Sequence, residues 1–358
     1  MNLPSSARAR LGLLAGGLAL LVVIAAVVAV VRHDSPRDVE KAAAAPTSAG
    51  PKGGDFTVHA YEGLGTWVDV FDYVPAYQQG GVTPTITAAD VDTMAALGVK
   101  TIYLQAARND ARTPDGIVAP ELLQPFLEKA HAHDIKVVGW YYPNFNDVNL
   151  DLERLLQIVH FDSGGQRFDG VAVDIEDNQA VKDPVERSVR LVDLSKRLRE
   201  AVGAHVALGA IVMPAVQTEV VNPLYWPTFP WADLKPYYDV WLPMAYWSFR
   251  DDPYHSGYTY VTESVRRMRA LVGDPNLKVH PIGGIADVVS EAEVRDFVKA
   301  LTDTDAVGGS LYDYRTTSGG VWGILRGVDA ALQAQPAPTT TLPDPTTAPP
   351  PPPAESTP

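Results

Sequence analysis

The segment Asp169-Gly-Val-Ala-Val-Asp-Ile-Glu176 alternates in the manner of a β-strand and ends in two acids. Because successive side chains of a strand point to opposite faces, its three β-branched residues share one face. Ala172, Asp174 and Glu176 share the other. In a closed parallel barrel, one face of each strand packs against helices and the other points inward. We therefore predict that Asp174 and Glu176 point into a barrel at the carboxyl end of this strand.

Similar runs, rich in β-branched and aromatic residues, recur along the chain. The predicted strands are Thr66–Phe71, Thr101–Ala106, Lys136–Tyr142, Gly170–Ile175, His205–Val212, Val240–Tyr246, Lys278–Gly283 and Val307–Tyr312. Their starts are roughly 30 to 40 residues apart, the length of one strand–helix unit. Eight such units predict an α/β fold, a (β/α)8 TIM barrel of about 250 residues. A doubly wound open sheet is the alternative, and eight evenly spaced units favour closure.

Helix signals fill the connections between these strands. Thr87 can cap a helix that runs to Leu97. Ser290 and Glu293 form a capping box. A long helix opens at Asp183-Pro184. Its apolar residues follow a helical spacing at Val189, Val192, Leu194 and Leu198.

The composition excludes several kinds of site and partner. The chain has no cysteine, so disulfides and thiolate chemistry are absent. Its 358 residues carry a formal net charge of −14, which argues against nucleic acid as a partner. His131 and His133 are two apart on a predicted helix, where such residues do not face each other. We expect no metal, no cofactor and a monomeric protein.

The two ends of the chain differ from its middle. Residues 11–31 form an uncharged apolar run that is long enough to span a bilayer and lacks a cleavage site. We expect an uncleaved signal-anchor there, with residues 1–10 cytoplasmic and a flexible linker at 32–54. Residues 55–334 would form the barrel outside the cytoplasm, held at the cell membrane. Residues 335–358 are almost all Pro, Thr and Ala and predict a disordered tail.

Two inward carboxyl groups at one strand end indicate acid catalysis. Like charges this close disfavour double ionisation, so the pKa of one should rise. A carboxyl that stays protonated near neutral pH can act as a general acid. Glu176, nearer the mouth, is the better acid, and Asp174 can orient it. The alternative is a salt bridge to Arg or Lys, but barrel enzymes carry their active sites at this end.

Two segments resemble a known family. The run Phe168–Glu176 resembles the DGxDxDxE strand of glycoside hydrolase family 18, the chitinases and their relatives. The run Leu242-Pro-Met-Ala-Tyr246 resembles the M-x-Y strand of that family. The resemblance implies that Glu176 protonates the glycosidic oxygen. It also implies that Asp174 steadies the acetamido group of the substrate as nucleophile, and that Tyr246 helps to hold this group.

The chain departs from this pattern at two positions. Ala172 stands where the family has a middle aspartate, and Trp247 stands where an aspartate usually follows the tyrosine. The first change removes a charge that supports Asp174, and the second removes a polar contact to the sugar. If substrate assistance fails, a second protein carboxylate is needed. The candidates for it are Asp72, Asp287 and Asp313.

Other strand ends carry the polar and aromatic residues that a sugar site requires. Sugars stack on aromatic faces and bond to planar polar groups. The predicted substrate contacts are Asp72, Gln105, Arg108, Trp140, Tyr142, Met244, Trp247 and Asp313. The aromatic loop Leu224–Trp231 is either a wall of the site or a plug that caps the barrel.

These features predict a glycoside hydrolase that acts on an extracellular or cell-envelope polysaccharide or oligosaccharide. The family resemblance adds that the substrate is N-acetylated. The alternative is a non-catalytic, lectin-like barrel at the cell surface, which the changes at Ala172 and Trp247 favour. A deacetylase is a third interpretation, but the strand ends lack the metal triad that it usually needs.

Overall fold

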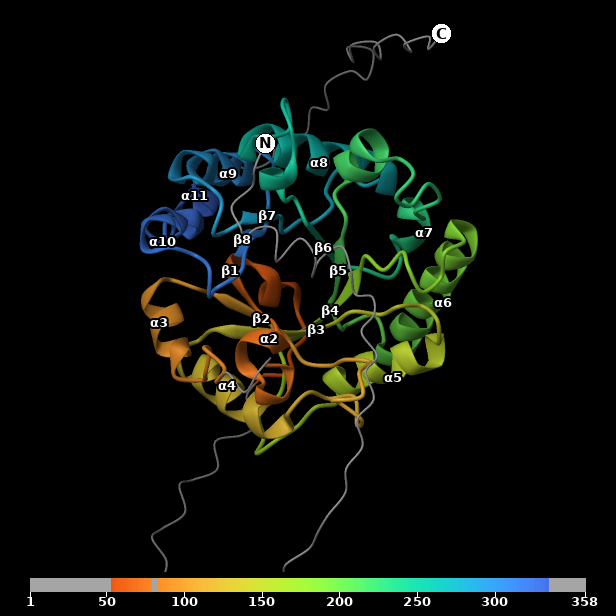
Figure 1. Ribbon diagram of the computed structural model, residues 1–358, viewed down its shortest axis with the longest axis vertical. Coiled ribbons are helices and arrows are strands. Elements are labelled where there is room, and N and C mark those ends of the chain that lie inside the picture. The colour runs from red at the N-terminus through yellow and green to blue at the C-terminus, as the bar shows by residue number, and fades with distance from the viewer. Residues whose placement is uncertain (1–52, 79–82, 335–358) are drawn as a thin grey trace, which may run out of the picture.

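The computed structural model describes residues 53–78 and 83–334, which form a ring of parallel strands enclosed by helices (Figure 1). The strands are β1 (Gly63–Val68), β2 (Thr101–Gln105), β3 (Lys136–Tyr141), β4 (Gly170–Ile175), β5 (Leu208–Val212), β6 (Val240–Pro243), β7 (Ile282–Ile285) and β8 (Gly308–Tyr312). They pair in the order β6-β5-β4-β3-β2-β1-β8-β7. Isolated parallel bridges, Trp241 with Val279 and Met244 with Ile282, connect the two ends of this sheet. The sheet is therefore a nearly closed barrel, as predicted, and not an open sheet.

Several strands differ from the predicted ranges at their ends. β1 ends at Val68 because Asp69 caps the next helix, accepting a hydrogen bond from Phe71 N. β7 begins only after Pro281, which has no N–H to give to a ladder. β4 has the predicted range. The sequence pattern therefore locates the strands better than it locates their ends.

Helices cover the outside of the barrel (Figure 1). The α-helices are α2 (Val70–Tyr73), α3 (Asp90–Ala96), α4 (Pro120–Ala132), α5 (Val148–Val159), α6 (Pro184–Val202), α7 (Trp231–Leu234), α8 (Gly257–Val272), α9 (Glu291–Asp303), α10 (Gly319–Leu325) and α11 (Val328–Gln333). The shorter turns are the 3-10 helices η1 (Val58–Tyr61), η2 (Pro75–Tyr77) and η4 (Trp247–Phe249), and the π-helix η3 (Gln217–Val221).

The predicted helix starts are partly confirmed. The capping box of Ser290 and Glu293 is present at α9, and Asp183 caps α6. α3 begins at Asp90, because Thr87 instead closes a turn by accepting a hydrogen bond from Ala89 N. The predicted apolar face of α6 is wrong at one position, where the side chain of Val189 is 60% exposed.

Two apolar layers lie on the two sides of β4. Its β-branched residues join the large cluster between strands and helices. Ala172 joins a smaller cluster with Trp67, Trp140 and Leu242, from three other strands, which fills the inside of the barrel. Asp174 and Glu176 continue the alternation that begins at Ala172. The predicted division of β4 into an outer and an inner face is confirmed.

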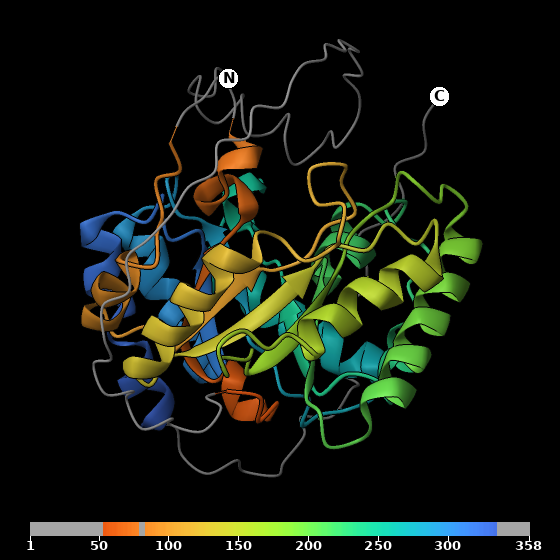
Figure 2. The ribbon, with the colours of Figure 1, turned by 90° about the horizontal axis from the view of Figure 1, so that it is seen from below.

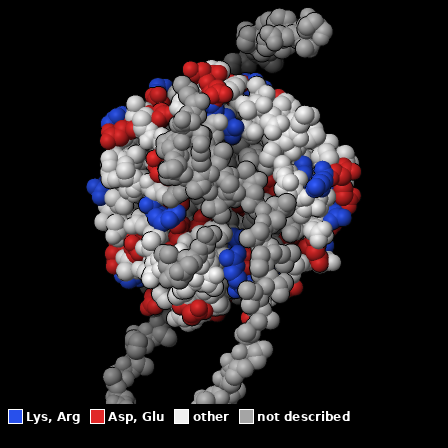
Figure 3. Space-filling model, in the orientation of Figure 1, with Lys and Arg blue, Asp and Glu red and all other residues white. Residues whose placement is uncertain are grey.

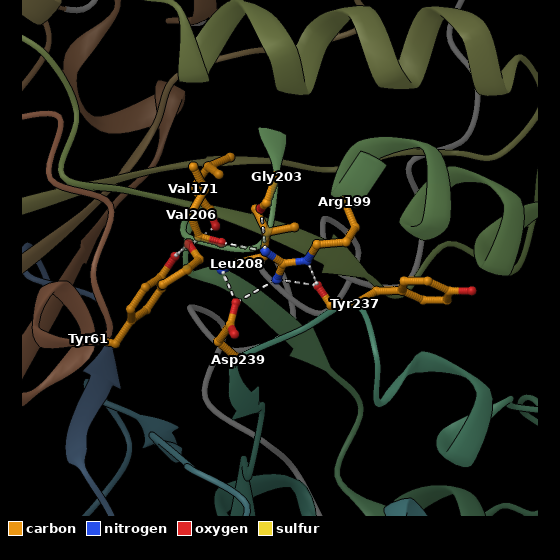
Figure 4. Close-up of polar contacts among 9 residues, drawn as sticks. Tyr61, Val171, Arg199, Gly203, Val206, Leu208, Tyr237 and Asp239 are labelled. Carbon is orange, nitrogen blue, oxygen red and sulfur yellow. Dashed lines mark hydrogen bonds and ion pairs between the residues drawn. The ribbon is translucent and has the colours of Figure 1, made fainter. Parts of the chain in front are cut away.

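Paired polar groups close the amino-terminal end of the barrel (Figure 4). The hydroxyl of Tyr61 donates to Val171 O at 2.8 Å and to Ala207 O at 3.2 Å. A Cβ at Gly209 would lie 2.8 Å from the Tyr61 ring, so this position needs glycine. The Tyr61 ring therefore fills the bottom of the barrel.

An arginine joins the neighbouring loops at the same end (Figure 4). Arg199 of α6 forms an ion pair with Asp239 at 2.5 Å. Its guanidinium also donates to the carbonyls of Gly203, Val206 and Tyr237. The Asp239 carboxylate in turn accepts a hydrogen bond from the Leu208 amide at 2.9 Å. We call this closed end, with Tyr61 and Arg199, the bottom of the barrel.

The opposite end, which we call the mouth, carries the loops that follow the strands. Figure 1 looks into the mouth, and Figure 2 shows it in side view, with α2 above the strands and η1 below. The described chain enters and leaves at the bottom. Gly54 N donates to Phe168 O just before β4, and Asp329 of α11 accepts from Leu64 N near the start of β1.

No helix within residues 53–78 and 83–334 has the length and apolar character needed to cross a membrane. The predicted span at 11–31, the segment 1–10, most of the linker at 32–54 and the tail at 335–358 lie outside the described residues.

Candidate active site

The two acids of β4 lie at the mouth. Asp174 is the penultimate residue of the strand, opposite Ile211 of β5, and Glu176 follows the strand directly. The Asp174 side chain is 7% exposed, and its Oδ1 accepts no hydrogen bond from the described residues. Glu176 is half-buried. The alternative interpretation, a salt bridge to Arg or Lys, is not formed by either acid within the described part of the chain.

Burial raises the pKa values of Asp174 and Glu176 and so favours their protonated forms. Desolvation first, and then the charge of Asp177, raise the pKa of Glu176 to about 7. Desolvation and then the charge of Glu176 raise the pKa of Asp174 well above its ordinary value. The two carboxyl groups titrate as a pair, because each proton bound changes the field at the other. Near neutral pH the pair therefore keeps a proton that an acid catalyst can donate.

Two tyrosines hold the backbone and the neighbour of Glu176. Tyr225 donates its hydroxyl to Glu176 O at 2.5 Å, and Tyr142 donates to the Asp177 carboxylate at 2.9 Å. Tyr142 is one of the predicted substrate contacts, and the structure places it against Asp177, the neighbour of Glu176. Its hydroxyl proton is already used by Asp177, so what it offers to a ligand is its ring and its oxygen lone pair.

The aromatic loop at Leu224–Trp231 is anchored outside the barrel. Trp226 is 1% exposed and packs under the guanidinium of Arg187, which lies 4.1 Å from its ring. Arg187 also donates to Tyr225 O at 3.2 Å. Leu224 at the tip is 86% exposed. The loop is therefore a wall beside Glu176, held by α6, and not a plug inside the barrel.

A second acidic group lies at the ends of β1 and β8. Carboxylate oxygens of Asp69, Asp72 and Asp313 all lie within 4.8 Å of one another. Asp69 accepts from the hydroxyl of Tyr312 at 2.6 Å. Arg315 Nε lies 2.6 Å from Asp72 Oδ1, an ion pair without the directionality of a hydrogen bond.

This second group also favours bound protons. Burial first, and then the charges of Asp69 and Asp313, raise the pKa of Asp72 to about 8. Burial raises the pKa of Asp69 as well. Oxygens this close could share a cation, but Arg315 already supplies a positive charge to Asp72. Asp287, the third candidate for a second carboxylate, lies outside this group, on the exposed loop after β7.

Aromatic rings connect the two acidic groups across the inside of the mouth. The Tyr246 ring lies 6.3 Å from Tyr312, which lies 6.4 Å from Trp67, and Trp67 lies 6.0 Å from Trp140. Burial raises the pKa of Tyr246, and Glu176, Asp174 and Asp313 add to this effect. The pKa of Tyr246 therefore depends on carboxylates of both acidic groups. Trp140 is 6% exposed, and its Nε1 has no hydrogen-bond acceptor within the described residues.

The remaining predicted contacts lie deeper or farther from Glu176. Gln105 is 2% exposed and its amide oxygen accepts from Val70 N. Met244 is 5% exposed within the inner cluster. Arg108 lies over the rings of Phe71 and Tyr77, at 5.3 Å from each.

Trp247 was predicted as a substrate contact, but the structure places it in the apolar core. Its side chain is fully buried and its ring lies 5.4 Å from Phe297 of α9. A Cβ at Gly283 or Gly284 would lie within 3.0 Å of it, so these glycines make room for the indole. Trp247 is therefore a core residue and offers no surface on which a sugar can stack.

Sequence reasoning missed four residues of this site. Tyr225, Asp177, Tyr312 and Arg315 contact the acids, yet none was among the predicted site residues. Asp177 and Tyr312 had a signal, because both adjoin predicted site residues at a strand end. Tyr225 had a weaker signal, because it lies in the aromatic loop Leu224–Trp231, but nothing in the sequence pointed to its contact with Glu176, 49 residues away along the chain. Figure 3 shows that acidic and basic side chains are interspersed around the edge of the mouth face.

No protein-family model matches the chain, and no curated protein matches it. Solved structures do share its fold. The endo-1,4-β-mannanase of Rhizomucor miehei aligns with a TM-score of 0.56 at 10% identity, over 80% of this chain and 99% of that one. The catalytic domain of psychrophilic chitinase B from Arthrobacter TAD20 aligns with 0.51 at 12% identity, over 81% and 99%.

A third neighbour is the spore cortex-lytic enzyme SleL of Bacillus megaterium, with a TM-score of 0.50 at 9% identity, over 74% of this chain and 73% of that one. At such identities the likeness shows the fold alone. The chain has the TIM-barrel fold found in chitinases and mannanases, in agreement with the family resemblance of its sequence.

Proposed function

We propose that the chain is a glycoside hydrolase that cleaves a polysaccharide, with Glu176 as its general acid. The observation that carries this proposal is the inward pair of Asp174 and Glu176 at the mouth of a TIM barrel, with the pKa of Glu176 raised to about 7. The neighbours named as mannanase, chitinase and cortex-lytic enzyme support the class of reaction. They act on different polymers, so they do not fix the sugar.

The reaction begins as Glu176 donates its proton to the glycosidic oxygen while the bond from this oxygen to the anomeric carbon breaks, so that the departing sugar leaves as an alcohol. A water molecule then adds to the anomeric carbon and gives up a proton to a carboxylate of the site. Asp174 faces the developing positive charge, or the acetamido group of an N-acetylated sugar as in the family that the sequence resembles. Ala172 stands where the family has an aspartate that supports Asp174, so the contribution of Asp174 should be weaker here than in that family. The carboxylates of Asp72 and Asp313 are then the candidates for a second catalytic group, because they share the mouth with Glu176.

The substrate that we propose is an extracellular or cell-envelope polysaccharide. The described barrel begins and ends at its bottom, opposite Glu176. A membrane span at 11–31, joined to the bottom of the barrel through the predicted flexible linker, would leave the mouth free to reach a polymer of the envelope. A monomer suffices for the reaction, because both acidic groups belong to one chain.

Replacement of Glu176 tests the proposal. Release of reducing ends is measured on chitin, mannan and peptidoglycan for wild type, Glu176→Gln and Glu200→Gln. Glu200 is the matched control, an exposed glutamate of α6 on the outside of the barrel. We expect turnover to fall by a factor of about 10²–10⁴ in Glu176→Gln and to stay unchanged in Glu200→Gln.

A lectin-like barrel is the other candidate, which the alanine at 172 favours. It predicts that wild type and Glu176→Gln bind one of these polymers equally and that neither releases reducing ends. That result would overturn the hydrolase.

A further inference from the structure

A groove opens beside the mouth on the side of β5 and β6. One wall is the end of η3, with Val220 and Val221, and the other is the segment Phe249–Tyr254 after β6. Its volume is about 280 Å³. Ligand pockets span roughly 300–1,000 Å³, so the groove is near the lower end of this range and suits a small unit.

Two contacts connect the residues of the groove to the candidate active site. The ring of Phe249 lies 6.4 Å from Tyr246 and perpendicular to it, and Tyr246 feels the charges of Glu176 and Asp174. On the other wall, the segment that carries Val221 continues to Tyr225, whose hydroxyl contacts the Glu176 carbonyl. Each wall is therefore connected to a residue near Glu176, one through Tyr246 and the other through Tyr225.

The lining of the groove combines apolar and polar surface. Phe249 is 37% exposed, Val220 is 41% exposed and Val221 is 42% exposed. Asp251 and Asp252 on the facing segment are also exposed. A lipid or an apolar peptide would strip water from these carboxylates without replacing its hydrogen bonds, which is unfavourable. A sugar ring has an apolar C–H face for Phe249 and hydroxyl groups for the carboxylates.

We propose that this groove is a sugar-binding subsite, which holds a unit of the polysaccharide that is not itself cleaved. The inference rests on the proposed function, because its ligand is the same polymer. A subsite outside the catalytic pair gives longer chains an extra contact. Affinity and turnover should therefore rise with chain length, as in an enzyme that cuts within a chain.

Length dependence of binding is the test. The probes are β-1,4-linked oligosaccharides of N-acetylglucosamine and of mannose, with two and six units, titrated by calorimetry into Glu176→Gln protein. Phe249→Ala removes the aromatic face, and Val221→Trp fills the groove. Val288→Trp is the matched control, because Val288 is also 42% exposed and lies on the loop after β7.

We expect the longer probe to bind more tightly than the shorter one. Phe249→Ala and Val221→Trp should each lower the affinity for six units by about fivefold to tenfold. The affinity for two units should not change, and Val288→Trp should resemble the parent. Equal affinity for two and six units of both sugars, unchanged affinity in the groove variants, or an equal loss in Val288→Trp would each overturn the proposal.

The same variants, made with Glu176 intact, separate this inference from the proposed function. Turnover that depends on Glu176 but not on Phe249 or Val221 at any chain length would overturn the subsite and leave the hydrolase. Length-dependent binding in the groove without any turnover that depends on Glu176 would overturn the hydrolase and leave a saccharide-binding barrel.

Discussion

The two ends of the barrel differ in how their buried polar groups are hydrogen-bonded. At the bottom, Tyr61 and Arg199 give their protons to named acceptors at 2.5–3.2 Å. At the mouth, Asp174 Oδ1 and Trp140 Nε1 are buried without a partner from the described residues. An unpaired buried polar group destabilises a fold by about 1–3 kcal/mol. The bottom is therefore built for stability, and the mouth keeps polar groups available for a ligand.

Titratable groups show the same contrast. His280 at the bottom is fully buried against Tyr61 O and Ser310, and burial lowers its pKa to about 4, so it stays neutral near pH 7. Burial raises the pKa of Glu176 at the mouth to about 7, so the charge of Glu176 changes near neutral pH. Burial favours the uncharged form of both groups, and of these two it is Glu176 that titrates near neutral pH.

The largest expected difference is between two arginines. Arg199→Met leaves Asp239 and three carbonyls without their donor, so the free energy of unfolding should fall by about 3 kcal/mol. Arg315→Met at the mouth should lower it by less than about 1 kcal/mol, because Asp72 can stay protonated when the charge of Arg315 is gone. Urea denaturation of both variants measures these values. Equal losses would remove the contrast between the two ends.

A smaller difference is expected between two tyrosines. Tyr61→Phe removes two buried hydrogen bonds and should lower the free energy of unfolding by about 1–2 kcal/mol. Tyr142→Phe removes one bond to Asp177 and should lower it by about 0.5 kcal/mol. Turnover should show the opposite order: it should fall in Tyr142→Phe and stay unchanged in Tyr61→Phe. A stability loss in Tyr142→Phe as large as that in Tyr61→Phe would argue that the mouth is structural.

The smallest expected effect is a gain. The pKa of Glu176 is higher in the folded chain than its ordinary value of 4.5, so the folded state holds more protons between pH 4.5 and about pH 7. The stability of the wild type should therefore fall as the pH rises through this window. Glu176→Gln lacks the ionisable group and should be more stable by about 1 kcal/mol at about pH 8, less than the full shift implies because solvent screens the half-buried Glu176. The difference should disappear below pH 4.5, and a variant less stable than wild type at about pH 8 would contradict this.

Local pattern predicted the barrel and its acids because both depend on alternation along a strand. β4 was located in full from eight residues, and its two faces follow from the period of two. The same reasoning misjudged Trp247, because η4 turns the chain after β6 and directs the indole towards Phe297. The aromatic loop that carries Tyr225 was recognised in the sequence, but the contact of Tyr225 with Glu176 was not, since it depends on how Arg187 and α6 hold this loop. Contacts set by tertiary packing leave no local signal.

A direct titration of Glu176 tests the central claim, that the mouth keeps an acid that is protonated near neutral pH. Infrared difference spectra follow the protonated-carboxyl band from acid to alkaline pH, and subtraction of the Glu176→Gln spectra leaves the titration that depends on Glu176, including its effect on Asp174. The account predicts a midpoint near pH 7. A midpoint near the ordinary glutamate value of 4.5 would show that Glu176 is ionised at neutral pH and cannot be the general acid.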